Sequence, residues 1–296
     1  MTDADHFFRR AESILDRLER FIPAPKHVDF ADGIAWRWRK TDKIGNLQRI
    51  DRFNPISLGD LHHIDHQKQE LNRNTRQFLN GLPANNALLW GPRGTGKSSL
   101  VKAILNTYAG DGLRLIEVER HHLVDLPEIV ENLHGNQGKF VVFCDDLSFD
   151  EQDNTYRALK VVLDGSVLST PDNLIIYATS NRRHLVPERL LENLDALPVD
   201  GEIHQSEAVE EKISLSERFG LWLSFHPFNQ DNYLDIVGHW LSAFNIAAAE
   251  DEEVRRAALQ WAMLHASRSG RSAYQFAKDW AGRTGLDKGS TLPNRL

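Results

Sequence analysis

The sequence predicts an open α/β sheet made of repeated strand–helix units, followed by a small all-helical module. Five short apolar runs occupy the middle of the chain, at residues 87–90, 113–118, 140–144, 174–178 and 221–225. Continuous apolar runs of this length are typical of strands that are covered on both faces of a parallel sheet. Helical segments lie between the runs, so we expect a five-stranded parallel sheet with right-handed crossovers and flanking helices.

The remaining segments divide the chain into three predicted parts. Helical spacing of apolar residues predicts helices at 6–21, 66–79, 98–108, 127–133, 156–163, 187–194, 231–244, 252–267 and 272–281. Residues 35–39 alternate like a strand and are followed by a linker-like stretch. We therefore expect an N-terminal helical and extended segment (1–54), an α/β domain (55–228) and a C-terminal helical lid (229–296).

Composition is that of an ordinary globular protein, with 41% hydrophobic and 26% charged residues among 296. No apolar run approaches the roughly 20 residues that span a bilayer, and the polar first ten residues do not form a secretory signal. A single cysteine, Cys144, cannot form an internal disulfide, which favours the cytoplasm. The net charge of −7 gives no support to a nucleic-acid partner.

Residues 91–98 read Gly-Pro-Arg-Gly-Thr-Gly-Lys-Ser and fit the phosphate-loop pattern G-x-x-x-x-G-K-[S/T]. The glycines let backbone N–H groups point at phosphate oxygens, and the predicted helix that follows adds its N-terminal dipole. Lys97 would contact the β- and γ-phosphates, and Ser98 would ligate Mg²⁺. We therefore expect ATP to bind along Gly91, Pro92, Arg93, Gly94, Thr95, Gly96, Lys97, Ser98 and Ser99.

Two carboxylates, Asp145 and Asp146, end the apolar run 140–144. If that strand lies beside the phosphate-loop strand, Asp145 would reach the Mg²⁺ shell. Asp146 would then orient or deprotonate the attacking water. Taken alone, two aspartates after a strand are as well explained by the start of a solvated loop.

Three further polar residues are candidates for contacts with phosphate. Asn181 follows the strand at 174–178, where a neutral amide can bond the γ-phosphate or the water without charge repulsion. Arg218 precedes the last predicted strand, and Arg271 opens the last predicted helix. Either arginine could stabilise charge on a transferring phosphate, although a lone arginine is more simply explained as a surface residue.

In this order, the motifs resemble those of the AAA+ ATPases, over residues 56–281. The pair Asp145-Asp146 and the Ser-x-Arg-Phe-Gly turn at 216–220 resemble the replication-initiator and helicase-loader branch. Residues 81–86, 123–127 and 218–223 look closer still to a bacterial AAA+ family of unknown function.

The resemblance implies a role for each matching residue. Gly91, Gly96, Lys97 and Ser98 match the Walker A motif, and Asp145 and Asp146 match Walker B. Asn181 matches sensor 1, Arg271 matches sensor 2 in the lid, and Arg218 matches an arginine finger. Because that finger acts on nucleotide bound by a neighbouring subunit, the resemblance implies a homo-oligomer, a ring or a helix, with ATP and Mg²⁺ at its interfaces.

Two departures from the family pattern bear on activity. Most AAA+ proteins have Glu where Asp146 stands, and the shorter side chain predicts slow ATP hydrolysis that a partner stimulates. Residues 119–123 lack the aromatic-aliphatic-Gly triplet of the machines that thread polypeptides.

Several functions remain open. The leading hypothesis is an ATPase that remodels or loads a macromolecular partner; the alternatives are a nucleotide-gated switch or scaffold that hydrolyses rarely, and a small-molecule kinase. The two late arginines disfavour the kinase, and the missing Asn-Lys-x-Asp motif disfavours a GTPase.

Two groups of residues suggest other sites less strongly. His62, His63, Asp65 and His66 are metal-ligand types without a second ligand segment, and we expect a solvated loop or helix start there. Trp36 and Trp38 alternate with arginines, as on single-strand nucleic-acid surfaces, but packing is the favoured interpretation.

Overall fold

The computed structural model describes residues 7, 10, 28–41, 44–53, 55–149, 155–164, 171–183, 185, 213–246 and 251–287. The chain divides into two compact units, residues 1–32 and 33–296. In the first unit Phe7 and Arg10 are helical, and the rest of the predicted helix 6–21 lies outside the described residues, as does the predicted helix 187–194. The boundaries of the three predicted parts stay a prediction.

The second unit is built on one seven-stranded sheet, in the order β2-β1-β4-β5-β6-β3-β7. Its strands are β1 (Ala35–Thr41), β2 (Ile44–Arg49), β3 (Ala87–Trp90), β4 (Leu113–Glu117), β5 (Lys139–Cys144), β6 (Leu174–Ser180) and β7 (Leu221–Ser224). All neighbours pair in parallel except β1 and β2, which form an antiparallel hairpin at one edge.

The prediction of five strands is therefore wrong, because the hairpin β1–β2 also belongs to the sheet. The five apolar runs do form β3 to β7, but β1 adds a sixth strand by pairing in parallel with β4. The seventh strand, β2, is half-exposed. Its residues, Ile-Gly-Asn-Leu-Gln-Arg, do not form the apolar run by which a buried strand is recognised. The interpretation of Trp36 and Trp38 as packing residues is confirmed, because they are only 2% and 1% exposed.

The phosphate-loop strand β3 lies between β6 and β7. The strand β5, which carries Asp145 and Asp146 at its end, is the neighbour of β6 and not of β3. Our expectation that it would lie beside β3 is corrected: the strand that carries Asn181 lies between them. Because the carboxyl ends of parallel strands share one edge of the sheet, the three strands still present their final residues together.

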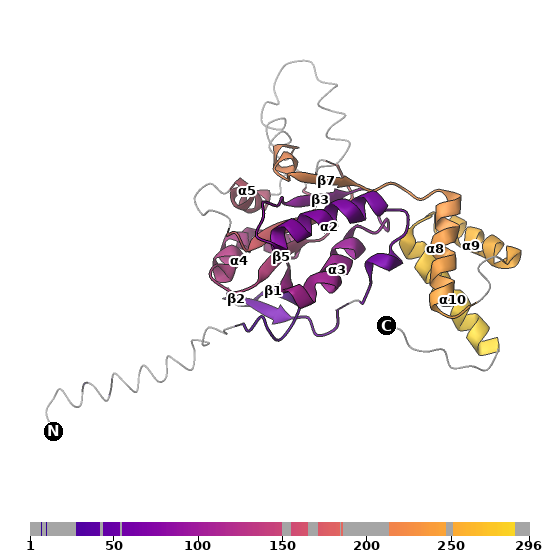
Figure 1. The fold of residues 1–296 in the computed structure, drawn as a ribbon, viewed down its shortest axis with the longest axis horizontal. Helices are drawn as coiled ribbons and strands as arrows, with labels where there is room; N and C mark the ends of the chain where they lie inside the picture. The colour runs from indigo at the N-terminus through magenta and orange to yellow at the C-terminus, as the bar shows by residue number, and fades with distance from the viewer. Residues whose placement is uncertain are drawn as a thin grey trace, which may run out of the picture. The chain divides into compact units, whose positions relative to one another are not determined.

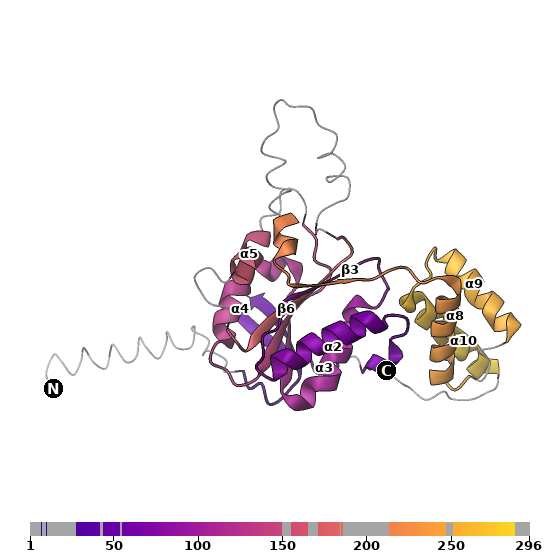
Figure 2. The same ribbon diagram turned by 45° about the horizontal axis from the view of Figure 1, so that its top comes forward.

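Helices cover both faces of the sheet (Figures 1 and 2). The helices α2 (Asp65–Leu79) and α3 (Lys97–Tyr108) pack on one face, against residues such as Leu89, Val141 and Tyr177. On the other side lie α4 (Leu126–Leu133) and α5 (Tyr156–Asp164), with their apolar sides buried. Short 3₁₀ turns connect these elements: η1 (Leu58–Asp60), η2 (Ala109–Asp111) and η3 (Arg120–Asp125).

The three helices predicted after residue 229 are present as α8 (Gln230–Ala243), α9 (Glu252–Leu264) and α10 (Gly270–Asp287). Side chains cap the first two: Asn229 accepts a bond from the N–H of Asn232, and Asp251 accepts one from the N–H of Glu253. The helix α10 continues past the predicted end at residue 281. Buried Tyr233 and Phe276 join the apolar core of this helical lid.

Candidate functional site

The loop between β3 and α3 has the backbone that its glycines predict. Gly91 and Gly94 have φ angles of +141° and +78°, in the left-handed region that favours glycine. A Cβ atom at Gly91 would lie 2.2 Å from the carbonyl oxygen of Phe225, so only glycine fits there. The first bond of α3 runs from the N–H of Leu100 to Gly96 O, at 2.8 Å. The N–H groups that precede it have no partner within the helix and are suited to an anion.

Lys97 is 7% exposed and folds back over this loop. Its ammonium donates to the carbonyl oxygens of Gly91 at 2.6 Å and Pro92 at 2.8 Å, and to Asn181 Oδ1 at 3.1 Å. Burial lowers the pKa of Lys97 to about 8, while the carboxylates of Asp145 and Asp146 act in the opposite direction. The ammonium is thus costly to keep charged in the empty site, and a bound polyphosphate would remove that cost.

Asp145 forms the centre of a cluster of oxygens at the end of β5. Its Oδ1 accepts bonds from the hydroxyls of Ser98 and Thr179, each at 2.5 Å. The same Thr179 hydroxyl accepts the N–H of Asp146 at 3.0 Å. Sequence reasoning missed Thr179, although its place at the polar end of an apolar strand was the available signal. It fixes both aspartates relative to β6.

Asp146 has φ of +54°, a left-handed conformation that aspartate tolerates better than most residues. Its Oδ1 accepts a bond from Asn181 Nδ2 at 2.5 Å, and its Oδ2 lies 3.5 Å from the guanidinium of exposed Arg93. Since Asn181 also accepts from Lys97, the residues Lys97, Asn181 and Asp146 form one continuous chain of hydrogen bonds. The sequence placed all three at the site, and the structure brings them together.

The lid reaches the phosphate loop at the start of α10. The N–H of Gly270 donates to Gly94 O at 2.9 Å. Ser269 packs so closely that a Cβ atom on Gly94 would lie 2.7 Å from its Oγ, and the Cβ of Arg271 is 3.5 Å from the same position. Arg271 therefore begins beside the loop, and its side chain is exposed. The contact of Ser269 was not foreseen.

Arg218 does not join the other predicted residues. It lies in the turn before β7, where its guanidinium pairs with Asp164 at the end of α5 and donates to Ser214 O at 2.7 Å. Among the described residues, no hydrogen bond or ion pair joins Arg218 to the phosphate loop of its own chain. Asp164 and Ser214 therefore hold Arg218 in this chain, and its predicted role on a neighbouring subunit stays a prediction.

The residues present fit ATP and Mg²⁺. Ser98 Oγ and Asp145 Oδ1 are a hydroxyl and a carboxylate oxygen in contact, the hard donors that Mg²⁺ prefers. The left-handed loop, the helix N-terminus and the buried ammonium of Lys97 are the features that hold a polyphosphate. Gly91, Pro92, Arg93, Gly94, Thr95, Gly96, Ser98 and Ser99 all belong to this loop or to the first turn of α3.

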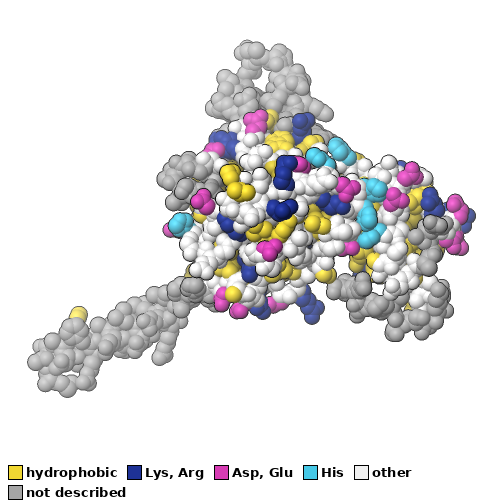
Figure 3. Space-filling model, in the orientation of Figure 1, with side chains coloured by type: hydrophobic (Ala, Val, Ile, Leu, Met, Phe, Trp, Pro, Cys, Tyr) yellow, Lys and Arg dark blue, Asp and Glu magenta, His cyan; other side chains and the backbone are white. Residues whose placement is uncertain are grey.

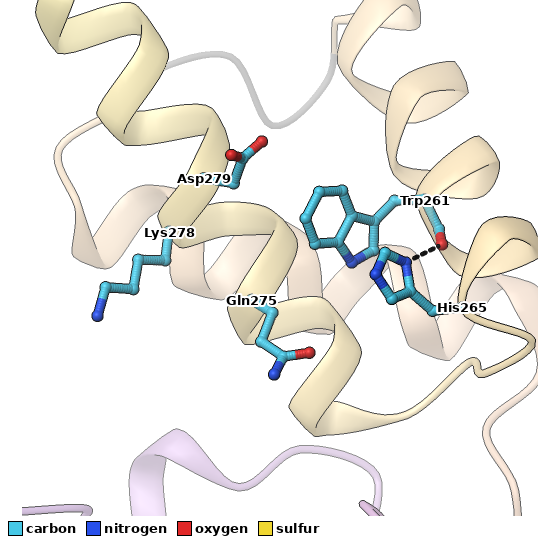
Figure 4. A pocket seen from close by; sticks show the side chains of 5 residues that line it. All are labelled: Trp261, His265, Gln275, Lys278 and Asp279. Carbon is cyan, nitrogen blue, oxygen red and sulfur yellow. Dashed lines mark hydrogen bonds between the residues drawn. The ribbon is translucent and has the colours of Figure 1, made fainter.

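A cavity of about 480 Å³ between α9 and α10 lies outside this site (Figure 4). The side chains of Trp261 and His265 line the cavity, and their rings stack with centroids 4.5 Å apart. His265 Nδ1 is 2.9 Å from Trp261 O. None of the predicted phosphate-binding residues lines this cavity.

Histidine side chains gather between α2 and α8 (Figure 3). The rings of His62 and His239 have centroids 4.3 Å apart, while His239 Nε2 is 3.2 Å from Asp60 and His63 Nε2 is 3.2 Å from Asp235. Within the described ranges, no group of three or more His, Cys, Asp or Glu residues is arranged to hold a metal ion.

With the site's geometry in place, comparison with known proteins assigns the chain to a family. A family model described as "Protein of unknown function (DUF815)" matches residues 31–284. The chain belongs to the DUF815 family. Its fold and relatives place this DUF815 chain among the AAA+ proteins, near the replication-related branch, which confirms the resemblance seen in the sequence.

Two curated relatives match part of this DUF815 chain. The replication factor C large subunit of Sulfolobus acidocaldarius is 31% identical over 117 residues, 37% of this chain and 25% of the relative. A 26S proteasome regulatory subunit 6B homolog of Schizosaccharomyces pombe is 27% identical over 144 residues, 42% of this chain and 37% of the relative. The chain thus spans less than half the length of these relatives.

A solved structure of similar fold is the Thermotoga maritima RuvB Holliday junction branch migration motor. It superposes on the DUF815 chain with a TM-score of 0.52 and 16% identity, covering 81% of this chain and 69% of RuvB. At that identity the likeness establishes the fold alone. In the part of the DUF815 chain that the structure describes, no helix is long and apolar enough to cross a membrane.

Proposed function

We propose that this protein binds ATP and hydrolyses it with Mg²⁺ at a site shared between two subunits. The chain of hydrogen bonds Lys97–Asn181–Asp146, next to the pair Ser98–Asp145, carries the proposal. These contacts support the proposal because they bring an ammonium, an amide, two carboxylates and a hydroxyl together at one edge of the sheet.

Each group has a separate task. The N–H groups of the loop and the start of α3 hold the β-phosphate, and Lys97 moves from the loop carbonyls to the phosphate oxygens. Ser98 and Asp145 hold Mg²⁺, which neutralises charge on the phosphates when bound. The amide of Asn181 contacts the γ-phosphate or the water, and Arg271 contributes a cation from the lid.

Asp146 is the proposed base. A water molecule forms a bond to the γ-phosphorus and passes its proton to Asp146, while the bond from the γ-phosphorus to the bridging oxygen breaks, leaving ADP and phosphate. The carboxylate is held by Asn181 and Arg93 and is one methylene shorter than the usual Glu. We therefore expect basal turnover below about 1 per second, stimulated by a partner.

The other half of the site comes from a second copy, which supplies Arg218. This arrangement requires a homo-oligomer, a ring or a helix, and a cytoplasmic location suits the single cysteine. Two relatives are named as subunits of replication factor C and of the 26S proteasome, and RuvB is described as a motor. These names support the proposal that turnover is coupled to remodelling or loading a macromolecular partner.

A nucleotide-gated switch or scaffold is the second candidate, and the restrained Asp146 favours it. Two substitutions separate the candidates. Lys97→Ala should abolish nucleotide binding and every function. Asp146→Asn should preserve ATP binding and lower hydrolysis by about 10²–10⁴-fold. Binding of fluorescent ATP and release of phosphate are the measurements. If partner binding needs ATP, and if both binding and release of the partner survive in Asp146→Asn, the result would favour the switch.

A further inference from the structure

A second cavity, of about 180 Å³, opens beside the phosphate-loop helix. Its walls come from α3, β1, β4, β5 and the segment that follows β2. The rings of Phe53 and Phe143 are apolar parts of the wall, and Arg37, Arg52 and Lys102 contribute cations. The cavity has room for one side chain rather than for a nucleotide, since a drug-sized ligand site is larger than about 300 Å³.

The cavity adjoins the metal-binding end of the nucleotide site. Lys102 lies four residues after Ser98, on the same side of α3 and about 6 Å further along the helix. Phe143 is the penultimate residue of β5, and Asp145 follows that strand directly. The cavity therefore has one wall residue four positions from Ser98 and another two positions from Asp145, the two proposed ligands of Mg²⁺.

The cations of this cavity outnumber its acids. Arg37 is paired with Glu117, its Nε lying 2.7 Å from Glu117 Oε2. Arg52 and Lys102 make no ion pair with any described residue. Two positive charges are thus left over in a pocket with aromatic walls, in a chain whose net charge is −7. A carboxylate on a short aliphatic stem has the complementary chemistry.

An acid of this kind stands next to the proposed arginine finger. Glu217 directly precedes Arg218, is exposed, and makes no ion pair within the described part of the chain. Because Glu217 and Arg218 are adjacent in the chain, any contact that Arg218 makes with a second copy brings this unpaired carboxylate to the same interface.

We propose that this cavity receives Glu217 of a second copy and so sets the position of Arg218 at the shared site. The inference rests on the proposed function, because it needs an oligomer with ATP at its interfaces. Glu217 acts as a positioning residue that fixes the register of the two subunits, while Arg218 alone meets the phosphates. The pairing is heterologous, so it can be repeated around a ring or along a helix.

A charge exchange tests the proposal with the full-length chain. Lys102→Glu and Glu217→Lys, each alone, should weaken ATP-dependent assembly by about tenfold or more in dissociation constant, because like charges then meet. The double variant should recover most of the loss. Sedimentation velocity with ATP measures assembly, and binding of fluorescent ATP to each monomer verifies that the variant is folded. Glu131→Lys, an exposed change on α4, is the matched control.

The outcomes separate this inference from the proposed function. A wild type that stays monomeric with ATP overturns both. If the wild type assembles and the single variants assemble equally well, only the pairing is overturned. The same holds if the double variant assembles as weakly as the sum of the two single losses predicts. Inorganic phosphate that stabilises the wild-type monomer and not the Lys102→Glu monomer would assign the cavity to a free anion and also overturn it.

Discussion

Lys97 is the residue whose chemistry should change most when ATP arrives. Burial lowers its pKa to about 8, and nearby phosphate charge favours the protonated form. In the empty site the ammonium loses its proton as the pH rises through 8, so binding above that pH must take up a proton. Affinity is therefore complete below pH 8 and should fall as the pH rises toward about 10.

Titration calorimetry in two buffers of different ionisation enthalpy measures this uptake directly. At about pH 8.5, where ATP is already fully ionised, we expect the apparent binding enthalpy to depend on the buffer. Lys102→Ala, a change one turn along α3, should leave the dependence intact. Equal enthalpies in the two buffers, with affinity unchanged between about pH 7.5 and 9.5, would contradict the account of Lys97.

Asn181 joins the phosphate-binding cation to the base, so its loss should affect chemistry more than binding. Asn181→Ala should lower the rate constant of hydrolysis by about 10²–10³-fold and change the dissociation constant of ATP only a few-fold. Single-turnover kinetics and equilibrium binding give the two quantities separately. Asn132→Ala, an exposed change on α4, serves as the control. A loss confined to affinity would rule out a role in the chemical step.

The charged residues and the loop residues of the site were predictable from the sequence. The residues that hold them in position were less predictable. Lys97, Ser98, Asp145 and Asp146 belong to motifs whose chemistry requires those residue types at that spacing. Thr179 was signalled only by its place at the polar end of an apolar strand, and nothing in the local sequence shows which groups Thr179 and Ser269 contact. Their effect depends on which strand tip or helix start lies opposite, and this is a property of the folded chain.

At the scale of elements, the histidines between the segment around η1 and helix α8 make that contact sensitive to acid. Burial lowers the pKa of His62, aided by His239, Lys68 and His63 and opposed by Asp60. A folded state that prefers neutral histidine is fully stabilised above the unfolded pKa of about 6.5 and loses stability as the pH falls through it. The decrease in melting temperature from pH 7.5 to 5 should be smaller in His62→Gln than in the wild type.

Exposed His134 offers the matched control, since His134→Gln should keep the wild-type pH dependence. Differential scanning calorimetry at several pH values measures both variants. If His62→Gln and His134→Gln behave alike, the contact between His62 and His239 is not responsible for the loss of stability in acid.

The hairpin β1–β2 is held to the sheet by its tryptophans. Trp38 is buried, and its indole N–H donates to Asp125 Oδ2 at 3.1 Å, while Lys40 pairs with the same carboxylate at 2.6 Å. Trp38→Ala should lower the free energy of unfolding by about 3–5 kcal/mol, and Trp38→Phe by about 2–3 kcal/mol, because it loses the hydrogen bond and part of the buried ring. Urea denaturation distinguishes these values, and a Trp38→Phe variant as stable as the wild type would contradict the role of the hydrogen bond to Asp125.

Strands with a continuous apolar run were predicted more accurately than strands without one. The strands β3 to β6 are interior and carry such runs because both of their faces are covered, and β7, at one edge of the sheet, was also recognised by its apolar run. The edge strand β2 is half-exposed and polar, so nothing in its composition distinguishes it from a linker. The order of β5, β6 and β3 depends on crossovers that bring distant segments together, and local sequence does not encode that order.

At the scale of the whole molecule, the site has all but one of its predicted parts. The loop after β3, the ends of β5 and β6 and the start of α10 meet, but Arg218 is held by Asp164 and Ser214 elsewhere on the chain. Arg218→Ala should therefore leave ATP binding to the monomer unchanged and lower turnover in the oligomer by about 10³–10⁵-fold. Phosphate release at rising protein concentration measures the effect, with exposed Arg76→Ala as the control.

The central claim, a catalytic site shared by two subunits, is tested most directly by mixing two inactive variants. Lys97→Ala lacks the nucleotide-binding cation, and Arg218→Ala lacks the finger, so each alone should be inactive. In random mixed oligomers about a quarter of the interfaces join an intact Lys97 to an intact Arg218. We predict that phosphate release from an equal mixture recovers to about a quarter of the wild-type rate. A mixture as inactive as its components, although sedimentation shows co-assembly, would contradict the shared site.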